Sequence, residues 1–387
     1  MNVKAIIGLI ALLMLVIFAP ALVSAATDYT TLTDAGWENF KFVKNVMIWF
    51  MLMLVAFLML FIKKYEWSVA LAVLLSAAGS FIVYLGINDC LLGVAWNQDL
   101  MLMGVICAIT VVIAIGCFLG TLKMWQYLAA GILFAPVFVL IEQFMVYMNA
   151  TDPGGSMLVH MCAAYFGLGV AIAIREKRAF DEPMYTTTHS VSFVWLASML
   201  LWVLWPAFVT ALLPMEQVFW GMMTCYLAGM GSILSAWIVC TVLQKKVNPL
   251  IYTYAMLAGP VAIGSPLLMV GPWGAILIGL IAGAISAACF VYLQPRLCKL
   301  LGALDVMGVH NLHGIGGWIG ALVSVILLMM IGSSSFAVAN LLTAIGVFVI
   351  ALVTGIIVGI IMKLSRGSMP NEKMFSDDAD FIKSEAP

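Results

Sequence analysis

The chain carries about eleven apolar runs, each close to twenty residues long, separated by short polar connections. A helix of that length crosses the hydrocarbon core of a bilayer, whereas membrane β-strands alternate in polarity over about ten residues. Hydrophobic residues make up 65% of the sequence and charged residues 9%, too few charges to cover a soluble surface. These features exclude a soluble enzyme, and the net charge of −1 offers no long-range field for nucleic acid. The sequence predicts an all-α, multi-pass membrane protein.

Hydropathy divides the chain into four segments. Residues 1–26 combine a lysine, an apolar stretch and a small-residue ending, which is typical of a cleaved signal peptide; an uncleaved first helix is the alternative. Residues 27–42 are an extracytoplasmic segment, 43–363 are the membrane domain, and 364–387 are a polar cytoplasmic tail. We expect the spans of the membrane domain at 43–62, 67–87, 99–121, 124–148, 156–174, 190–213, 217–243, 249–270, 273–294, 308–331 and 337–362.

Positive charge alternates along the chain in step with the spans. Lysine and arginine follow every second span. The intervening loops contain Asp89, Asp152 and Glu216 but no lysine or arginine. Because cytoplasmic loops retain positive charge, this pattern places the mature N-terminus outside and the C-terminus inside. Lys41 and Lys44, before the first span, lie outside this cytoplasmic set. The set comprises Lys63, Lys64, Lys123, Arg175, Lys177, Arg178, Lys245, Lys246, Arg296, Lys299, Lys363 and Arg366.

Two stretches share the pattern D-x-x-G-x-x-x-x-H, and each opens a membrane span. Five spans per half is an odd number, so the second half is inverted in the membrane relative to the first. The sequence therefore predicts two inverted five-helix repeats plus a final helix, with the functional site at the interface between the repeats. The first copy is Asp152, Gly155 and His160 at the fifth span, and the second is Asp305, Gly308 and His313 at the tenth.

The residue types in this motif have a physical explanation. An aspartate at a helix start accepts hydrogen bonds from free backbone N–H groups, so a capping and anchoring role is favoured for Asp152 and Asp305 over cation binding. The glycines allow close backbone approach. The histidine follows about two turns later, roughly 12 Å along the axis, which places it near the middle of the bilayer.

The chain has four histidines, and an ionisable side chain inside a membrane is a candidate for function. We expect a structural role for His189, and for His310 and Asn311 a supporting or vestibule position beside His313. Two facing neutral imidazoles, His160 and His313, share one proton and supply polar contacts in an apolar passage. A charged solute has no favourable place there, so the pair selects a small neutral polar molecule, or one that leaves its proton at the mouth.

At these residues the sequence resembles the ammonium transporter/Mep/Rhesus superfamily, and specifically its Rhesus (Rh) branch. The most specific match is GVHNLHGIGG at 308–317. Further matches are DPGGSMLVHMCAAYFG at 152–167, LWVLWPAF at 201–208 and LAGPVAIGS at 257–265, in order along the mature chain. The resemblance implies a homotrimer in the cell (plasma or inner) membrane, with eleven helices and one narrow hydrophobic pore in each subunit.

The resemblance also implies roles for individual residues. The family's twin pore histidines fall on His160 and His313, and its helix-capping aspartate falls on Asp152. The glutamate that the Rh branch carries before the fifth span falls on Glu142, within I-E-Q-F.

The sequence departs from the family at the outer vestibule. By ungapped counting, the two stacked gate phenylalanines become Ile106 and Leu200, and a tryptophan that helps Amt members hold a cation becomes Leu140. Without these rings there is little cation–π attraction for ammonium. We therefore expect an apolar, less constricted mouth, with NH3 as the solute and CO2 or another small gas as the alternative.

The function expected from the sequence is passive conduction of neutral NH3 after ammonium loses its proton at the mouth. No enzyme activity, cofactor or metal is expected, and no nucleotide-binding loop is present in the sequence. The partners expected are ammonia or ammonium, the lipid bilayer and two further copies of the chain. The tail, with Asp377, Asp378 and Asp380, is expected to be solvated, and its binding of a regulatory protein is left open.

Three other readings stay open at this point. A haem protein would use His160 and His313 as axial ligands. An intramembrane metalloenzyme would use His310 and His313, although the sequence has no H-E-x-x-H motif. A non-conducting sensor or structural subunit of the same fold is the third.

Overall fold

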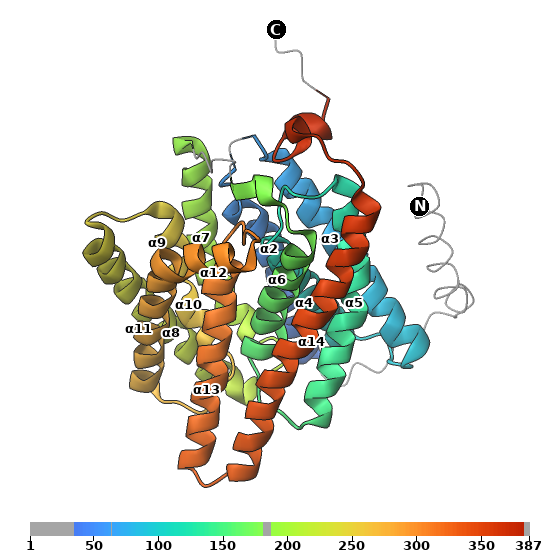
Figure 1. Ribbon diagram of the computed structural model, residues 1–387. Coiled ribbons are helices and arrows are strands. Elements are labelled where there is room, and N and C mark those ends of the chain that lie inside the picture. The colour runs from blue at the N-terminus through green and yellow to red at the C-terminus, as the bar shows by residue number, and fades with distance from the viewer. Residues whose placement is uncertain (1–34, 63, 181–186, 383–387) are drawn as a thin grey trace.

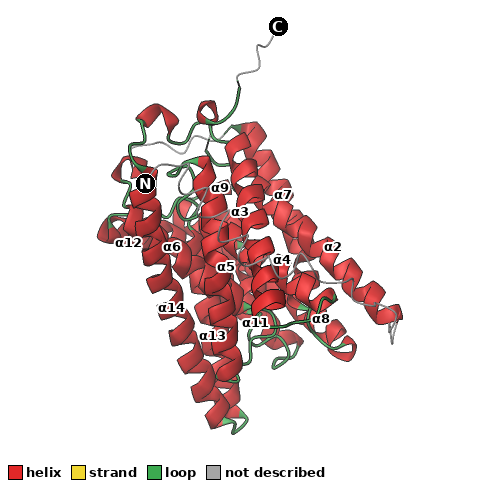
Figure 2. Cartoon of the chain, turned by 90° about the vertical axis from the view of Figure 1, so that its right-hand side faces the viewer, coloured by secondary structure: helices red, strands yellow, loops and turns green. Residues whose placement is uncertain are grey.

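The computed structural model of the protein describes residues 35–62, 64–180 and 187–382. Within these ranges the chain is helical and contains no strand. The helices lie side by side in a single bundle (Figures 1 and 2). The expected signal segment, 1–26, lies outside the described residues, so its cleavage stays a prediction.

The α-helices are α2 (Ala35–Leu58), α3 (Trp67–Gly86), α4 (Gln98–Ile115), α5 (Met124–Tyr147), α6 (Cys162–Ile174), α7 (Thr188–Val209), α8 (Met215–Gln244), α9 (Pro249–Ala255), α10 (Ala258–Ala262), α11 (Pro272–Ala288), α12 (Gln294–Leu301), α13 (Ile315–Met330) and α14 (Ser334–Arg366). Four π-helical segments adjoin them: η2 (Ile87–Leu91), η3 (Ser156–Met161), η5 (Cys289–Leu293) and η6 (His310–Gly314). Three short 3₁₀ turns are η4 (Lys177–Phe180), η7 (Asn371–Lys373) and η8 (Asp377–Ala379).

Ten helical stretches in the described residues are long and apolar enough to cross a bilayer. This confirms the all-α, multi-pass membrane fold. The first of them begins earlier than expected, because α2 starts at Ala35 rather than at residue 43. The spans that contain α4 and α6 are the most buried of the ten, so these two helices form the centre of the bundle.

The expected eighth span, 249–270, is not one continuous helix. It consists of the short helices α9 and α10 followed by irregular chain, because Pro260 and Pro266 have no N–H to donate to a helix. The irregular chain is buried and bonded to neighbours: the Ser156 hydroxyl donates to the Val261 carbonyl, and the Ser265 N–H donates to the Ser156 hydroxyl. Non-helical backbone at membrane depth is stable where protein groups satisfy it. The number of eleven crossings therefore stays a prediction.

Small residues bring the long helices into close contact. α8 packs against α11, and α6 packs against α14. A Cβ added at Gly279 of α11 would lie 1.9 Å from the Ala228 carbonyl oxygen of α8, and one added at Gly355 of α14 would lie 2.2 Å from the Phe166 carbonyl oxygen of α6. Membrane helices associate mainly by such packing, because lipid is as apolar as their side chains.

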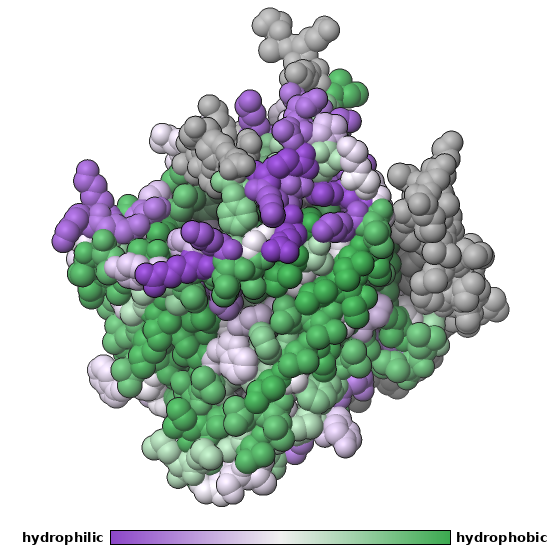
Figure 3. Space-filling model, in the orientation of Figure 1, coloured by the Kyte–Doolittle hydropathy of each residue, from purple (hydrophilic) through white to green (hydrophobic). Residues whose placement is uncertain are grey.

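Hydrophilic side chains gather at the end of the bundle that carries the C-terminus, while apolar side chains cover the flank below (Figure 3). We call this end the C-terminal face and the other end the opposite face. Lys123 precedes α5, Arg175 follows α6, Lys245 follows α8 and Arg366 ends α14, all at this face. These basic residues of the loops thus lie at one end of the bundle, as the alternation in the sequence requires, whereas Lys41 and Lys44 do not belong to this set. The side of the membrane that each face occupies stays a prediction.

The tail after α14 is only partly solvated: Asp378 and Asp380 are exposed, as expected, but other residues of the tail pack on the bundle. It folds back over the C-terminal face (Figure 1), where Met374 and Phe375 are buried. The Phe375 N–H donates to the Gly120 carbonyl, and its ring lies where a Gly120 side chain would otherwise be. The Asp377 carboxylate accepts hydrogen bonds from the first free N–H groups of α3 and so caps that helix. The buried apolar residues and the capping aspartate therefore attach the tail to the bundle, although most of its residues are polar.

Candidate functional site

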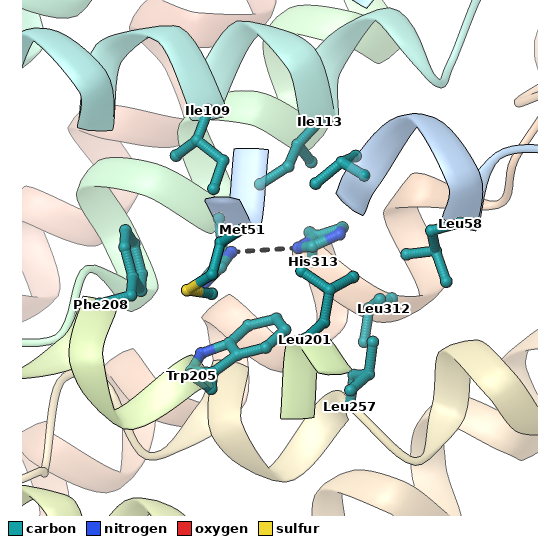
Figure 4. A pocket seen from close by; sticks show the side chains of 12 residues that line it. Met51, Leu58, Ile109, Ile113, Leu201, Trp205, Phe208, Leu257, Leu312 and His313 are labelled. Atoms are coloured by element: carbon teal, nitrogen blue, oxygen red, sulfur yellow. Dashed lines mark hydrogen bonds between the residues drawn. The ribbon is translucent and has the colours of Figure 1, made fainter. Parts of the chain in front are cut away.

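A small cavity lies at the centre of the bundle, with the two motif histidines in its wall. Its volume is about 30 Å³, enough for roughly one water-sized molecule. Phe208 lies at one end and Leu58 and Leu257 lie at the other, with the imidazoles between them (Figure 4). The lining residues are Met51, Val55, Leu58, Ile109, Ile113, His160, Leu201, Trp205, Phe208, Leu257, Leu312 and His313.

The two histidines contact each other directly. Their Nδ1 atoms are 3.0 Å apart, the dashed line in Figure 4, and their rings stack at 5.1 Å between centroids. One ring must donate and the other must accept, so the neutral pair shares a single proton. His160 is 1% exposed, and its Nε2 has no hydrogen-bond partner in the described part of the chain. That nitrogen is therefore available to a small solute in an otherwise apolar space.

A haem does not fit between these residues. The Nδ1 atoms touch, so no metal can lie between them, and the cavity holds a molecule the size of water rather than a porphyrin. The described residues also contain no group of three or more histidine, cysteine or acidic side chains placed to hold a metal ion.

The first copy of the motif positions His160 through a π-helical turn. Gly155 has a φ of +77°, a conformation that suits glycine, and its carbonyl accepts the His160 N–H five residues later. The Asp152 carboxylate accepts hydrogen bonds from the backbone N–H groups of Met157 and Leu158 and from the Ser265 hydroxyl. The extra residue in a π turn rotates the side chains that follow it. This turn therefore sets the direction of the imidazole.

The second copy repeats the same construction. His313 lies in the π-helical segment η6, and Gly308 has a φ of +67°. The Asp305 carboxylate accepts the N–H groups of Val309 and His310. The two histidines therefore have the same local support, one in each half of the chain.

The two copies approach the cavity from opposite ends of the bundle. Beside Asp152, the Thr151 N–H donates to the side chain of Asn340, near the start of α14 at the opposite face. Just after Asp305, the Met307 N–H donates to the carbonyl of Gly116, near the C-terminal face. The helices that carry the histidines thus enter from opposite faces and meet at the imidazole pair, which is the arrangement that an inverted repeat requires.

The positions expected at the vestibule gate do not line the cavity. Ile106 is buried and Leu200 is half-buried, and neither is among the lining residues. An aromatic wall nevertheless lies beside His160, with the ring centroids of Trp205 and Phe208 at 5.7 and 5.9 Å. These rings lie at the imidazole pair, so the apolar, less constricted mouth and the gate role of Ile106 and Leu200 stay predictions.

The other candidate residues lie away from the cavity. Glu142, on α5, accepts a hydrogen bond from the Tyr84 hydroxyl at 3.0 Å. His310 packs edge-on against Tyr165, and its buried Nδ1 has no partner among the described residues. Asn311 donates to the Gln294 side chain, and His189 is an exposed residue that packs on Phe193. None of these four side chains touches the imidazole pair.

Several lining residues were not identified from the sequence. Met51, Val55 and Leu58 recur at intervals of four and three along α2, a spacing that marks one helix face but not which neighbour it meets. The order LWVLWPAF placed Trp205 and Phe208 in a family match without assigning them a position at the site. The spacing of these residues could therefore have identified the helix faces. Only the tertiary structure shows that these faces meet at one cavity.

Comparison with known proteins identifies the family. The family model described as Ammonium Transporter Family matches residues 7–384. The chain belongs to the ammonium transporter family. This confirms the family resemblance inferred from the motifs.

Rh-type proteins are among the most similar relatives. Bovine ammonium transporter Rh type A is 34% identical over 283 residues, which cover 70% of this chain and 66% of that protein. Bovine ammonium transporter Rh type C is 30% identical, with 83% of this chain and 78% of that protein covered. The structure of Nitrosomonas europaea Rh50, from the Rhesus protein family of channels, superimposes with a TM-score of 0.83 at 33% identity over 90% of this chain and 93% of that one. These matches confirm the Rh-type assignment and the transporter fold.

Proposed function

We propose that this protein is an Rh-type ammonia channel that conducts neutral NH3 passively along the cavity between Phe208 and Leu58. The observation that carries the proposal is the hydrogen-bonded imidazole pair of His160 and His313 in an otherwise apolar cavity. Ammonia both donates and accepts hydrogen bonds, so it matches a pair in which one ring donates and the other accepts. The similarity to Rh-type ammonium transporters supports the same solute.

Charge explains why the neutral form crosses. The residues that line the cavity include no carboxylate. An ammonium ion would therefore lose its hydration there without gaining a counter-charge, at a cost of several kcal/mol. Ammonium therefore releases its proton before it enters, and NH3 interacts with His160 and His313 as it passes. Asp152 and Asp305 act as caps that hold the two histidine-bearing turns. The conduction step needs no enzyme activity and no cofactor.

The assembly follows the family. We propose a homotrimer in the plasma or inner membrane, with one conduit in each subunit and the C-terminal face in the cytoplasm. The lysines and arginines that flank α5, α6, α8 and α14 at that face support the orientation. The apolar flank of the bundle supports contact with lipid and with other copies of the chain.

Stopped-flow recording of internal pH in proteoliposomes tests the function. We expect wild-type protein to raise NH3 permeability above that of empty liposomes. The double variant His160→Ala/His313→Ala removes both polar contacts, and loss of about 1 kcal/mol of hydrogen bonding lowers the flux about fivefold. His189→Ala is the matched control, because this histidine is exposed and remote from the cavity, and its flux should equal wild type.

The outcomes separate the alternatives. Wild-type NH3 flux equal to that of bare lipid would refute the channel and favour a sensor or structural role. Acceleration of CO2 alone would retain the fold assignment and replace the solute. Equal NH3 flux in the wild type and the double variant would show that the imidazole pair does not contact the solute.

A further inference from the structure

Two lysines are buried at the end of the cavity-lining face of α2. Lys41 is 2% exposed and Lys44 is 8% exposed. Lys44 precedes the lining residue Met51 by seven residues, which is two turns and about 10 Å along the axis. Two turns return to the same helix face, so Lys44 continues the line of Met51, Val55 and Leu58 towards the opposite face of the bundle.

The contacts of these lysines place them where the cavity-lining helices converge. Lys44 Nζ donates to the Thr210 hydroxyl at 2.6 Å, just after α7 ends. Lys41 Nζ donates to the Ala211 carbonyl at 2.9 Å and forms an ion pair with Asp99, in the first turn of α4, at 2.7 Å. The helices α2, α4 and α7 all line the cavity. Their ends therefore meet around the two ammonium groups.

Among the described residues, only one of these two charges has a counter-charge. Asp99 compensates Lys41, whereas the described partners of Lys44 are the Thr210 hydroxyl and the Phe40 ring, 5.0 Å from its Nζ. No described carboxylate lies within 4 Å of Lys44 Nζ. A buried lysine without a counter-charge is costly, so packing alone does not account for it.

We propose that Lys44 is a charge filter at the mouth of the conduit on the opposite face, which the charge pattern predicts to be extracytoplasmic. Its ammonium group repels ammonium and other small cations from the entrance and leaves access to neutral ammonia. At about 10 Å and an effective dielectric constant of about 20, one unit charge lowers the local concentration of a monovalent cation by on the order of tenfold. The inference rests on the proposed function, because it concerns the form of the solute that the conduit admits.

The half-saturating ammonium concentration for flux tests the filter. It is measured by stopped flow in proteoliposomes at about pH 6, where almost all of the solute is protonated. Lys44→Gln removes the charge and should lower this concentration about tenfold. Lys44→Arg keeps the charge and should match wild type. Lys245→Gln, which removes an exposed lysine from the C-terminal face, is the matched control and should also match wild type.

Substitutions at Thr210 separate charge from hydrogen bonding. Thr210→Val removes the partner of Lys44 but keeps the charge, so the half-saturating concentration should not change. Thr210→Glu places a carboxylate beside Lys44 Nζ and should lower the concentration as Lys44→Gln does, with α2 intact. If Lys44→Gln fails to fold, Thr210→Glu provides the test of the charge instead.

The charge filter can be rejected separately from the proposed channel function. Unchanged half-saturating concentrations in Lys44→Gln and Thr210→Glu, with normal flux, would reject the filter and leave the channel intact. The same decrease in Thr210→Val would show that the hydrogen bond, rather than the charge, is responsible. No ammonia flux in wild type would reject the proposed function, and the filter with it.

Discussion

At the residue scale, one carboxylate holds the turn that carries His160. Asp152 lies just before that span and is half-buried; burial raises its pKa to about 6, while hydrogen bonds from Ser265 and from backbone N–H groups oppose that rise. Three of its hydrogen bonds reach two elements, the π turn and the irregular chain after α10. Loss of the Asp152 carboxylate would therefore free the His160 imidazole to move and would weaken the contact between the π turn and the chain after α10.

Asp152→Ala should lower the free energy of unfolding by about 2 to 3 kcal/mol, since a helix cap and charged hydrogen bonds are lost together. Ser265→Ala removes one of these bonds and should cost about 1 kcal/mol. Thermal unfolding in detergent measures both, and NH3 flux should fall in parallel for Asp152→Ala. Equal midpoints for Asp152→Ala and wild type would contradict the capping role.

At the element scale, close helix contacts determine the position of the site. α6, which continues from the His160 turn, packs against α14 with Gly355 directly over the Phe166 carbonyl. A side chain there would push the two helices apart, because the Phe166 carbonyl oxygen belongs to the backbone and cannot rotate away.

Gly355→Ala should destabilise the protein by about 1 to 3 kcal/mol, the usual cost of overpacking. Gly271→Ala is the control, since a Cβ at that position would meet no atom within 4 Å. The difference in thermal midpoint between the two variants is the measurement. If both variants unfold at the same temperature, α6 and α14 tolerate separation and the close approach is not required.

At the scale of the whole molecule, the tail joins helices that are distant in sequence. Arg178 donates to the Met369 carbonyl and to the Asn371 side chain, and Glu176 accepts hydrogen bonds from both Arg178 and Arg366. Glu176 therefore orients the arginine that attaches the tail to the end of α6. The tail then continues to the start of α3, where Asp377 caps that helix.

This attachment should depend on pH. The hydrogen bond from Arg178 lowers the pKa of Glu176 to about 2, and burial opposes it. A depressed carboxyl pKa stabilises the fold above the ordinary value of 4.5 and loses that effect as the pH falls towards 2. Glu176→Gln should therefore unfold at a lower temperature than wild type at about pH 7, and the gap should narrow at about pH 3 and close only as the pH reaches about 2.

Thermal midpoints of both proteins across this pH range provide the test. Glu372→Gln is the matched control, because Glu372 is exposed in the same tail, and it should match wild type at every pH. A gap between Glu176→Gln and wild type that persists unchanged at about pH 3 would show that ionisation of Glu176 is not the cause.

Much of this molecule follows from local properties of the sequence. Apolar runs, the alternation of basic loops and the repeated Asp-Gly-His spacing each depend on how a short segment meets lipid, water or its own backbone N–H groups. They predicted the all-α membrane fold and the pairing of His160 with His313, while the resemblance of stretches such as GVHNLHGIGG indicated the family. The same reasoning failed for 249–270, where apolar composition indicates a span but two prolines and buried hydroxyls decide the backbone.

What only the tertiary structure decided is where separate segments meet. The 3.0 Å contact between the imidazoles, the aromatic wall of Phe208 and the contact of Lys44 with Thr210 each join residues distant in sequence. The tail was misjudged for the same reason, since Phe375 is buried only because Gly120 leaves room for its ring. Solvation acts on each segment separately and is therefore readable from sequence. Close packing depends on which two surfaces come together, and no single segment contains that information.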